Sequence, residues 1–181
     1  IQQTGEVSDF PGQMVRRDGS VIDISISSHA LYDQAGNFAG VEGIYRDVTQ
    51  RKNLERELHR LATTDMLTGM ANRRAFLEAA TQVYEQARAD GAPFALLMLD
   101  LDHFKTINDE LGHLEGDRAL AEFAHVVKAQ LRATDVVGRL GGEEFCVLLP
   151  LTAHDQAVEI ATRIMHGVAC TPLTDETGRP Y

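Results

Sequence analysis

Arg139-Leu140-Gly141-Gly142-Glu143-Glu144-Phe145 is the stretch that predicts the centre of the fold. Apolar β-forming residues flank it, at 136–137 before it and at 145–149 within and after it. Two adjacent glycines between such runs predict a hairpin, because tight two-residue turns need positive φ angles. Glu143 and Glu144 then stand on the rim of the turn, on opposite faces of an ideal strand. We expect a cation, most simply a metal ion, beside carboxylates placed in this way.

A second pair of acids, Asp100 and Asp102, ends the apolar run 94–99. This run is typical of a buried central strand. Both aspartates share one face of the strand, since side chains alternate with a period of two. If this strand lies beside the hairpin, carboxylates from two strands converge on one place. Hard oxygen ligands that leave coordination positions open suit Mg²⁺ with a nucleoside triphosphate.

Length and charge narrow the possible functions. The 181 residues suffice for one domain and part of another, and their formal net charge is −10. This charge argues against a general nucleic-acid-binding or anionic-membrane surface, so a phosphate substrate would need a metal ion and locally placed Lys or Arg. No apolar run approaches the roughly 20 residues of a membrane span, and we expect no signal peptide. We expect a cytoplasmic protein, and a membrane anchor upstream of residue 1 stays open.

The first 48 residues are predicted to form antiparallel β-structure. Within 21–27, isoleucines at every second position alternate with polar residues. Turn-forming residues occupy 17–20 and 33–37. Together with the closing Asp47-Val48-Thr49, these features resemble the C-terminal half of a PAS sensor domain.

Residues 49–64 are predicted to form a helix, with Thr49 as its cap. Leu54, Leu58 and Leu61 fall at heptad-like spacing between charged residues. The helix is either a solvated connector packed on its own domain or a parallel coiled-coil stalk that joins two protomers. The narrow apolar stripe favours the stalk.

From residue 72 onward the predicted order is helix, strand, helix, helix, strand, strand, helix. Asn72 is expected to cap the first of these helices and Gly91 to end it. A loop at 112–116 is expected before a longer helix that starts at Asp117. Thr152 is expected to cap the last helix, whose predicted apolar side is Val158, Ala161, Met165 and Val168.

Other catalytic chemistries lack their motifs in this sequence. It contains no Gly-rich P-loop, no Cys/His spacing suited to zinc and no supporting motif for Ser-His-Asp catalysis. Asp100 is the hardest residue to explain structurally, because an unpaired carboxylate after a buried strand is costly. Other candidates have a plain explanation as helix caps, dipole partners or solvent-exposed residues: Asp102, His103, Lys105, Asn108, Asp117 and Arg132.

Several ordered motifs together resemble the GGDEF family, the diguanylate cyclases. They are 100–109, 112–117 and 141–145, joined by the N-terminal signature at 65–69 and 72–74, with Met70 where leucine is usual. The resemblance implies an α/β (α+β) fold with a ferredoxin-like βαββαβ core, akin to polymerase palms and class III nucleotide cyclases. It implies three segments: a PAS-like part at 1–48, a helical coiled-coil linker at 49–64, and a GGDEF domain at 65–181. The family domain continues through a further strand, so the domain here looks truncated at its C-terminus.

The same resemblance implies the condensation of two GTP into cyclic di-GMP and two pyrophosphates, by a homodimer whose protomers each hold one GTP. It implies Mg²⁺ or Mn²⁺ as the cofactor, bound by Asp100, the Leu101 carbonyl, Glu143 and Glu144. Glu143 would also accept the proton of the attacking 3′-hydroxyl, with Lys105 stabilising charge on the phosphates and Glu144 nearby. The implied GTP-binding residues are Asn108 and Asp117 at the guanine edge and His113 near the nucleotide.

An inhibitory product site is also implied. Arg132-Ala133-Thr134-Asp135 resembles the family's Arg-x-x-Asp motif, and Arg163 is a candidate supporting guanidinium. Two other functions stay open beside the enzyme under PAS and product control. One is a catalytically silent GTP or cyclic di-GMP receptor that relays a signal, and the other is a dimerisation module alone. Intact Asp100, Lys105, Glu143 and Glu144 favour the enzyme.

Overall fold

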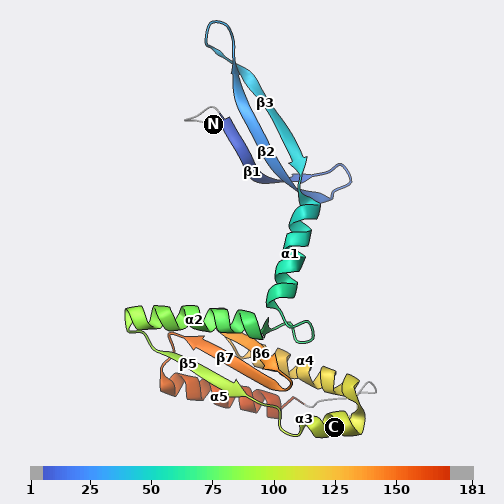
Figure 1. Ribbon diagram of the computed structural model, residues 1–181, viewed down its shortest axis with the longest axis vertical. Coiled ribbons are helices and arrows are strands. Elements are labelled where there is room, and N and C mark those ends of the chain that lie inside the picture. Colours follow the sequence, from blue (N-terminus) through green and yellow to red (C-terminus); the bar gives the residue numbers. More distant parts are fainter. Residues whose placement is uncertain (1–5, 172–181) are drawn as a thin grey trace. The chain divides into compact units, whose positions relative to one another are not determined.

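The computed structural model describes residues 6–171 (Figure 1). The chain divides into two compact units, Ile1–His59 and Arg60–Tyr181. Helix α1 (Thr49–Thr63) contains the boundary between them. Across the described residues, no helix combines the length and the hydropathy needed to cross a membrane.

The first unit is a three-stranded antiparallel sheet followed by α1. Strands β1 (Glu6–Val15), β2 (Val21–Tyr32) and β3 (Phe38–Asp47) pair in chain order. The expected meander is therefore present, and Ile24 of β2 is buried as the alternation predicts. Asp23, which the alternation places on the polar face, is also buried, with only 8% of its surface exposed.

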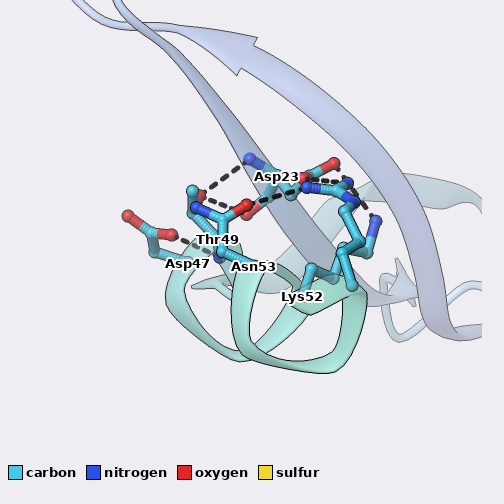
Figure 2. A network of polar contacts seen from close by, with 6 residues as sticks. Asp23, Asp47, Thr49, Lys52 and Asn53 are labelled. Atoms are coloured by element: carbon cyan, nitrogen blue, oxygen red, sulfur yellow. Dashed lines mark hydrogen bonds and ion pairs between the residues drawn. The ribbon is translucent and has the colours of Figure 1, made fainter. Parts of the chain in front are cut away.

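Figure 2 shows why a carboxylate can be buried at Asp23. Lys52 and Arg56, one turn apart on α1, donate to its two oxygens at 3.2 and 2.9 Å. The Thr49 hydroxyl accepts from the Asp23 backbone N–H at 2.9 Å, so Thr49 ties α1 to β2 and does not act as the helix cap. The Asp47 carboxylate accepts from the Thr49 N–H at 3.0 Å. We call Asp23, Thr49, Lys52 and Arg56 the Asp23 cluster.

The second unit is a mixed four-stranded sheet covered by helices. Its strands are β4 (Ala71–Asn72), β5 (Phe94–Leu99), β6 (Val136–Gly141) and β7 (Glu144–Pro150), in the spatial order β4-β6-β7-β5. Strand β4 runs parallel to β6, and the other neighbours are antiparallel. Its helices are α2 (Arg73–Asp90), α3 (Phe104–Leu111), α4 (His113–Ala129) and α5 (His154–Ala169).

Strand β7 is the centre of the core, because residues 145–149 are buried on both faces of the sheet. Phe145, Val147 and Leu149 pack against α4 and α5. Cys146 and Leu148 face α2, where Phe76 packs on them. Figure 1 shows the resulting layers, with α2 on one side of this sheet and α5 on the other.

The expectation that 94–99 forms a central strand is wrong within the described residues. Strand β5 is at the edge of the sheet, and Phe94, Leu96 and Met98 on one of its faces are exposed. The opposite face, with Leu97 and Leu99, packs on the main core. The elements β5, α3–α4, β6, β7 and α5 follow the first five of the expected βαββαβ order. A sixth element would follow α5 and lies outside the described residues.

Two helix starts also differ from the prediction. Helix α4 begins at His113, so 113–116 is helical and Asp117 lies inside the helix and is not its cap. In α5 the N-cap is Ala153, whereas the Thr152 hydroxyl donates to the Pro150 carbonyl at 2.9 Å. Asn72 and Gly91 bound α2 as predicted: the Asn72 side chain accepts from Ala75 N–H at 3.0 Å, and Gly91 is left-handed with φ 65°.

Candidate functional site

The β6–β7 hairpin forms where the sequence predicts it, with its turn one residue further along. Gly141 pairs with Glu144, so Gly142 and Glu143 are the two turn residues. Gly142 has a φ of 53°, a conformation that glycine adopts without steric cost. An irregularity between Arg139 and Gly141 advances the register by one residue. Glu143 is half-buried in the turn, and Glu144 is exposed at the start of β7.

The strand register brings the two acidic stretches together. Leu99 of β5 pairs with Phe145 of β7, the last pair of that ladder. Asp100 and Leu101 follow this pair on one strand, and Glu143 and Glu144 precede it on the other, so the two acidic stretches lie at the same end of the sheet. Asp100 is exposed and not buried, because β5 ends at Leu99 and the chain leaves the sheet there.

These acids are without bonded partners among the described residues. No hydrogen bond or ion pair within 6–171 engages the side chains of Asp100, Glu143 or Glu144. The Leu101 carbonyl accepts from the Phe104 N–H at 3.3 Å and keeps a second lone pair. No three His, Cys, Asp or Glu side chains of the described residues gather closely enough to hold a metal ion on their own.

Asp102 and His103 lie between β5 and α3. Asp102 is exposed and does not cap the helix, because the N-cap is His103 in the left-handed conformation, with φ 61°. The His103 side chain makes no capping hydrogen bond. Lys105 follows in the first turn of α3 with an exposed side chain.

Sequence reasoning missed Arg139, which connects the hairpin to the N-terminal signature. Its Nε donates to the Gly142 carbonyl in the turn at 2.9 Å. Its Nη1 lies 3.3 Å from Asp65 Oδ1, which also accepts from the N–H and hydroxyl of Thr68 at 3.0 and 2.7 Å. Burial raises the pKa of Asp65, but the Thr68 hydrogen bonds and the Arg139 charge outweigh it and hold the pKa below its usual value.

The rest of the N-terminal signature binds the end of α1. Asn72 Nδ2 donates to the Ala62 carbonyl at 2.9 Å, and the Arg74 guanidinium donates to the same oxygen. The carbonyls of a last helical turn lack helical partners, so these side chains satisfy an end of α1 that would otherwise face water. The signature residues at 65–74 thus join the end of α1 to the sheet that carries the hairpin.

The predicted GTP-binding residues come together where α3 meets α4. His113 Nδ1 lies 3.2 Å from Asn108 Oδ1. Gly116 is buried against the same amide: a Cβ at this position would be 2.1 Å from Asn108 Oδ1. Asp117 follows Gly116 directly, is exposed, and has no side-chain partner among residues 6–171.

The Arg132–Asp135 motif forms a closed turn before β6. Asp135 Oδ2 accepts from the Arg132 N–H at 2.8 Å, and the Asp135 N–H donates to the Arg132 carbonyl at 3.1 Å. The Arg132 side chain is exposed. Arg163 of α5 donates to the Gln130 carbonyl, two residues before the turn, and both line one surface pocket.

The match to a family model decides the classification. The model of the GGDEF family, described as "Diguanylate cyclase, GGDEF domain", matches residues 62–178. The chain belongs to this family. The chain is 43% identical over 129 residues to the response regulator PleD of Caulobacter vibrioides, covering 71% of this chain and 28% of PleD. It is 37% identical over 152 residues to the probable diguanylate cyclase DgcE of Escherichia coli, covering 84% of this chain and 14% of DgcE.

Solved structures agree with the GGDEF fold. The coiled coil and GGDEF domain of DgcB from Caulobacter crescentus, solved in complex with c-di-GMP, matches with a TM-score of 0.69 and 30% identity. That match covers 74% of this chain and 70% of the DgcB chain. SiaD of Pseudomonas aeruginosa, a diguanylate cyclase solved with its activator SiaC, matches with a TM-score of 0.65 and 36% identity, covering 73% and 50%. This chain spans less than a third of the length of PleD or DgcE.

Proposed function

We propose that this chain condenses two GTP molecules into cyclic di-GMP and releases two pyrophosphates. The observation that supports the proposal is the pairing of β5 with β7, which ends at Leu99 and Phe145 and leaves Asp100 and Leu101 at the same end of the sheet as Glu143 and Glu144. A polar cluster without internal partners at the end of a packed sheet is poor design for stability and suits a ligand. Membership of the GGDEF family indicates which ligand that is.

The donor set fits Mg²⁺ or Mn²⁺. Asp100, the Leu101 carbonyl, Glu143 and Glu144 offer hard oxygens, the ligand type that these ions prefer, and nucleotide phosphates would complete the coordination. A divalent ion bound there would neutralise charge on the triphosphate. The residues around it would then hold the substrate in line for attack.

The chain's own residues divide the remaining work. Glu143, in the turn, would accept the proton that the 3′-hydroxyl loses as its oxygen bonds to the α-phosphorus of the second GTP. The bond from that phosphorus to pyrophosphate breaks in the same displacement. Lys105, exposed on α3, would stabilise charge on the phosphates. Asn108 and Asp117 would read the guanine edge, with His113 close by, and an aspartate that accepts from N1–H and N2–H selects GTP over ATP.

Two protomers would be needed, because each would supply one GTP. The exposed leucines of α1, Leu54, Leu58 and Leu61, are 50–65% exposed and support a coiled coil with a second copy. The preceding sheet would be the C-terminal part of a PAS-like sensor that changes the register of α1. The segments proposed are the sensor part at 1–48, the linker at 49–64 and the GGDEF domain at 65–181.

Product control would act at the Arg132–Asp135 turn. Guanidinium groups recognise phosphate and guanine, and the Arg132 side chain has no partner among the described residues. Arg163 lies beside the same turn through its bond to Gln130. The c-di-GMP complex of the similar DgcB domain supports this proposal.

Product analysis tests the function. The purified chain is incubated with GTP and Mg²⁺, and nucleotides are separated by chromatography, with Glu143→Gln as the matched variant. We expect cyclic di-GMP from the parent and none from the variant, which has an amide where the proposed proton acceptor stood. Cyclic di-GMP binding without turnover by the parent would favour a receptor that relays the signal. Dimerisation with no nucleotide binding would favour a dimerisation module.

A further inference from the structure

The orientation of the Asn108 amide has a structural cause that the proposed role in guanine binding does not explain. Asn108 Oδ1 lies 3.2 Å from His113 Nδ1. A carbonyl oxygen only accepts hydrogen bonds, so His113 donates to it in the tautomer that carries the proton on Nδ1. In that tautomer, the hydrogen bond holds the oxygen end of the Asn108 amide toward α4.

Gly116 provides the space in which this end of the amide lies. A Cβ at this position would lie 2.1 Å from Asn108 Oδ1 and 2.9 Å from its Cγ. It would also be 3.3 Å from the ring of Phe104, so the amide has little room to move aside. Only a glycine at 116 therefore leaves room for Asn108 Oδ1 beside α4.

With its oxygen held inward, the amide presents its nitrogen to solvent. Asn108 Nδ2 donates to no described residue. It is not a buried, unpaired atom either, so it is accessible to solvent. An outward NH₂ group offers only donors. At a purine edge it suits the O6 acceptor of guanine and opposes the N6 amino group of adenine.

We propose that His113 and Gly116 are specificity-determining positioning residues, which hold the Asn108 amide as a donor toward guanine O6. This inference rests on the proposed function, in which Asn108 and Asp117 meet the guanine edge. It divides the labour between them: Asp117 accepts from N1–H and N2–H, and the Asn108 amide reads O6. His113 acts through Asn108 and need not touch the base.

Equilibrium binding of nucleoside diphosphates tests the proposal, because diphosphates carry the base and cannot release pyrophosphate. Calorimetry compares GDP with 6-thio-GDP, which has a poor acceptor at position 6, and with IDP, which lacks the N2 amino group. In the parent, GDP should bind about fivefold more tightly than 6-thio-GDP, the value of one neutral hydrogen bond. In His113→Ala this ratio should fall to within about twofold of unity, and the GDP/IDP ratio should stay at the parent value.

Three further variants distinguish a positioning role from a general loss of structure. In His113→Asn the amide nitrogen Nδ2 is bonded to Cγ, as Nδ1 is in histidine. This variant can therefore still donate to Asn108 Oδ1 and should restore the GDP/6-thio-GDP ratio. Asp117→Asn should change the GDP/IDP ratio and leave the 6-thio ratio unchanged. Gly116→Ala should lose the O6 preference, with its thermal unfolding recorded to confirm that the protein folds.

The outcomes distinguish the inference from the function on which it rests. If His113→Ala weakens GDP, IDP and 6-thio-GDP by one common factor, the positioning role is wrong while guanine binding stands. If the parent binds none of the diphosphates, the proposed nucleotide site itself is wrong, and the inference falls with it.

Discussion

At the residue scale, Arg139 does the most to place the hairpin turn. It holds the Gly142 carbonyl with Nε and the Asp65 carboxylate with Nη1. Glu143, the next residue in the turn, has no hydrogen bond of its own within the described residues, so its position depends on this neighbour. A small displacement of a catalytic group is enough to cost a large factor in rate.

Replacing Arg139 should therefore lower turnover more than substrate affinity. In Arg139→Ala we expect kcat for cyclic di-GMP formation to fall about 10- to 100-fold, with KM for GTP changed much less. Arg139→Lys is the matched control, which keeps the charge but cannot hold both partners with one planar group. A kcat within twofold of the parent in Arg139→Ala would contradict the role given to this side chain.

Sequence patterns single out the acids and amides of the candidate site, but not the residues that contact them. Asp100, Asn108, Asp117 and Glu143 stand out because polar residues directly follow apolar runs or fall in family motifs. Arg139 gave no such signal, because an arginine on an alternating strand is ordinary. Its contact with Asp65 spans 74 positions, and such separations are decided by tertiary packing that no local periodicity reports.

At the element scale, the buried side of a helix and the order of the strands in a sheet are harder to predict from the sequence than the elements themselves. In α5 the buried residues are Ala157, Ile160 and Ile164, whereas the predicted side included Val158 and Met165, which are 50% and 69% exposed. Apolar residues occur on both sides of this helix, so the sequence did not distinguish the side that packs on β7. Strand order likewise depends on partners far along the chain, and among the described strands β5 lies at the edge and not at the centre.

The Asp23 cluster also acts at the element scale, because it fastens the start of α1 to β2. The hydrogen bonds and charges of Arg56 and Lys52 hold the pKa of Asp23 below its usual value of 3.8. A depressed folded-state pKa means that ionised Asp23 stabilises the fold above the unfolded-state pKa. That stabilisation is lost as the pH falls through the folded-state pKa.

Asp23→Asn should lower the thermal midpoint of the first unit at pH 7. The difference from the parent should shrink as the pH falls below about 4, where the parent carboxylate also becomes protonated. Circular dichroism melts at pH 7 and pH 3 measure this, with Arg56→Met and the double variant completing a cycle. Equal differences at the two pH values, or effects that simply add in the double variant, would show that the ion pairs do not contribute.

The leucine stripe of α1, formed by Leu54, Leu58 and Leu61, is the second feature at the element scale. Leu54→Asp with Leu58→Asp should abolish the dimer that analytical ultracentrifugation detects. Cyclic di-GMP synthesis should fall at least tenfold at micromolar protein, about the loss expected when charges replace leucines that the dimer would bury. Leu54→Met with Leu58→Met keeps the apolar volume and should retain both properties. A charged double variant that dimerises and cyclises like the parent would refute the stalk.

At the scale of the whole molecule, binding of the product cyclic di-GMP would inhibit its further synthesis. Arg132→Ala should raise the cyclic di-GMP concentration for half-inhibition about tenfold or more, since charge-assisted hydrogen bonds to phosphate are lost. Turnover without product should stay near the parent value, because the Arg132 turn precedes β6 and the hairpin tip follows it, at the opposite end of that strand. Inhibition curves for parent and variant that superimpose would remove the proposed product site.

The central claim at this scale is that the β5 end and the hairpin turn form one metal-dependent GTP site. The most direct test is the initial rate of cyclic di-GMP formation across a Mg²⁺ series for parent, Asp100→Asn and Asp102→Asn. Asp102 is the matched control, since it is an exposed aspartate two residues away in the same loop. The account predicts that Asp100→Asn needs at least tenfold more Mg²⁺ or loses activity, about the loss of one charged ligand, while Asp102→Asn follows the parent. Identical Mg²⁺ dependence in all three, or a parent that forms no cyclic di-GMP at any Mg²⁺ concentration, would contradict it.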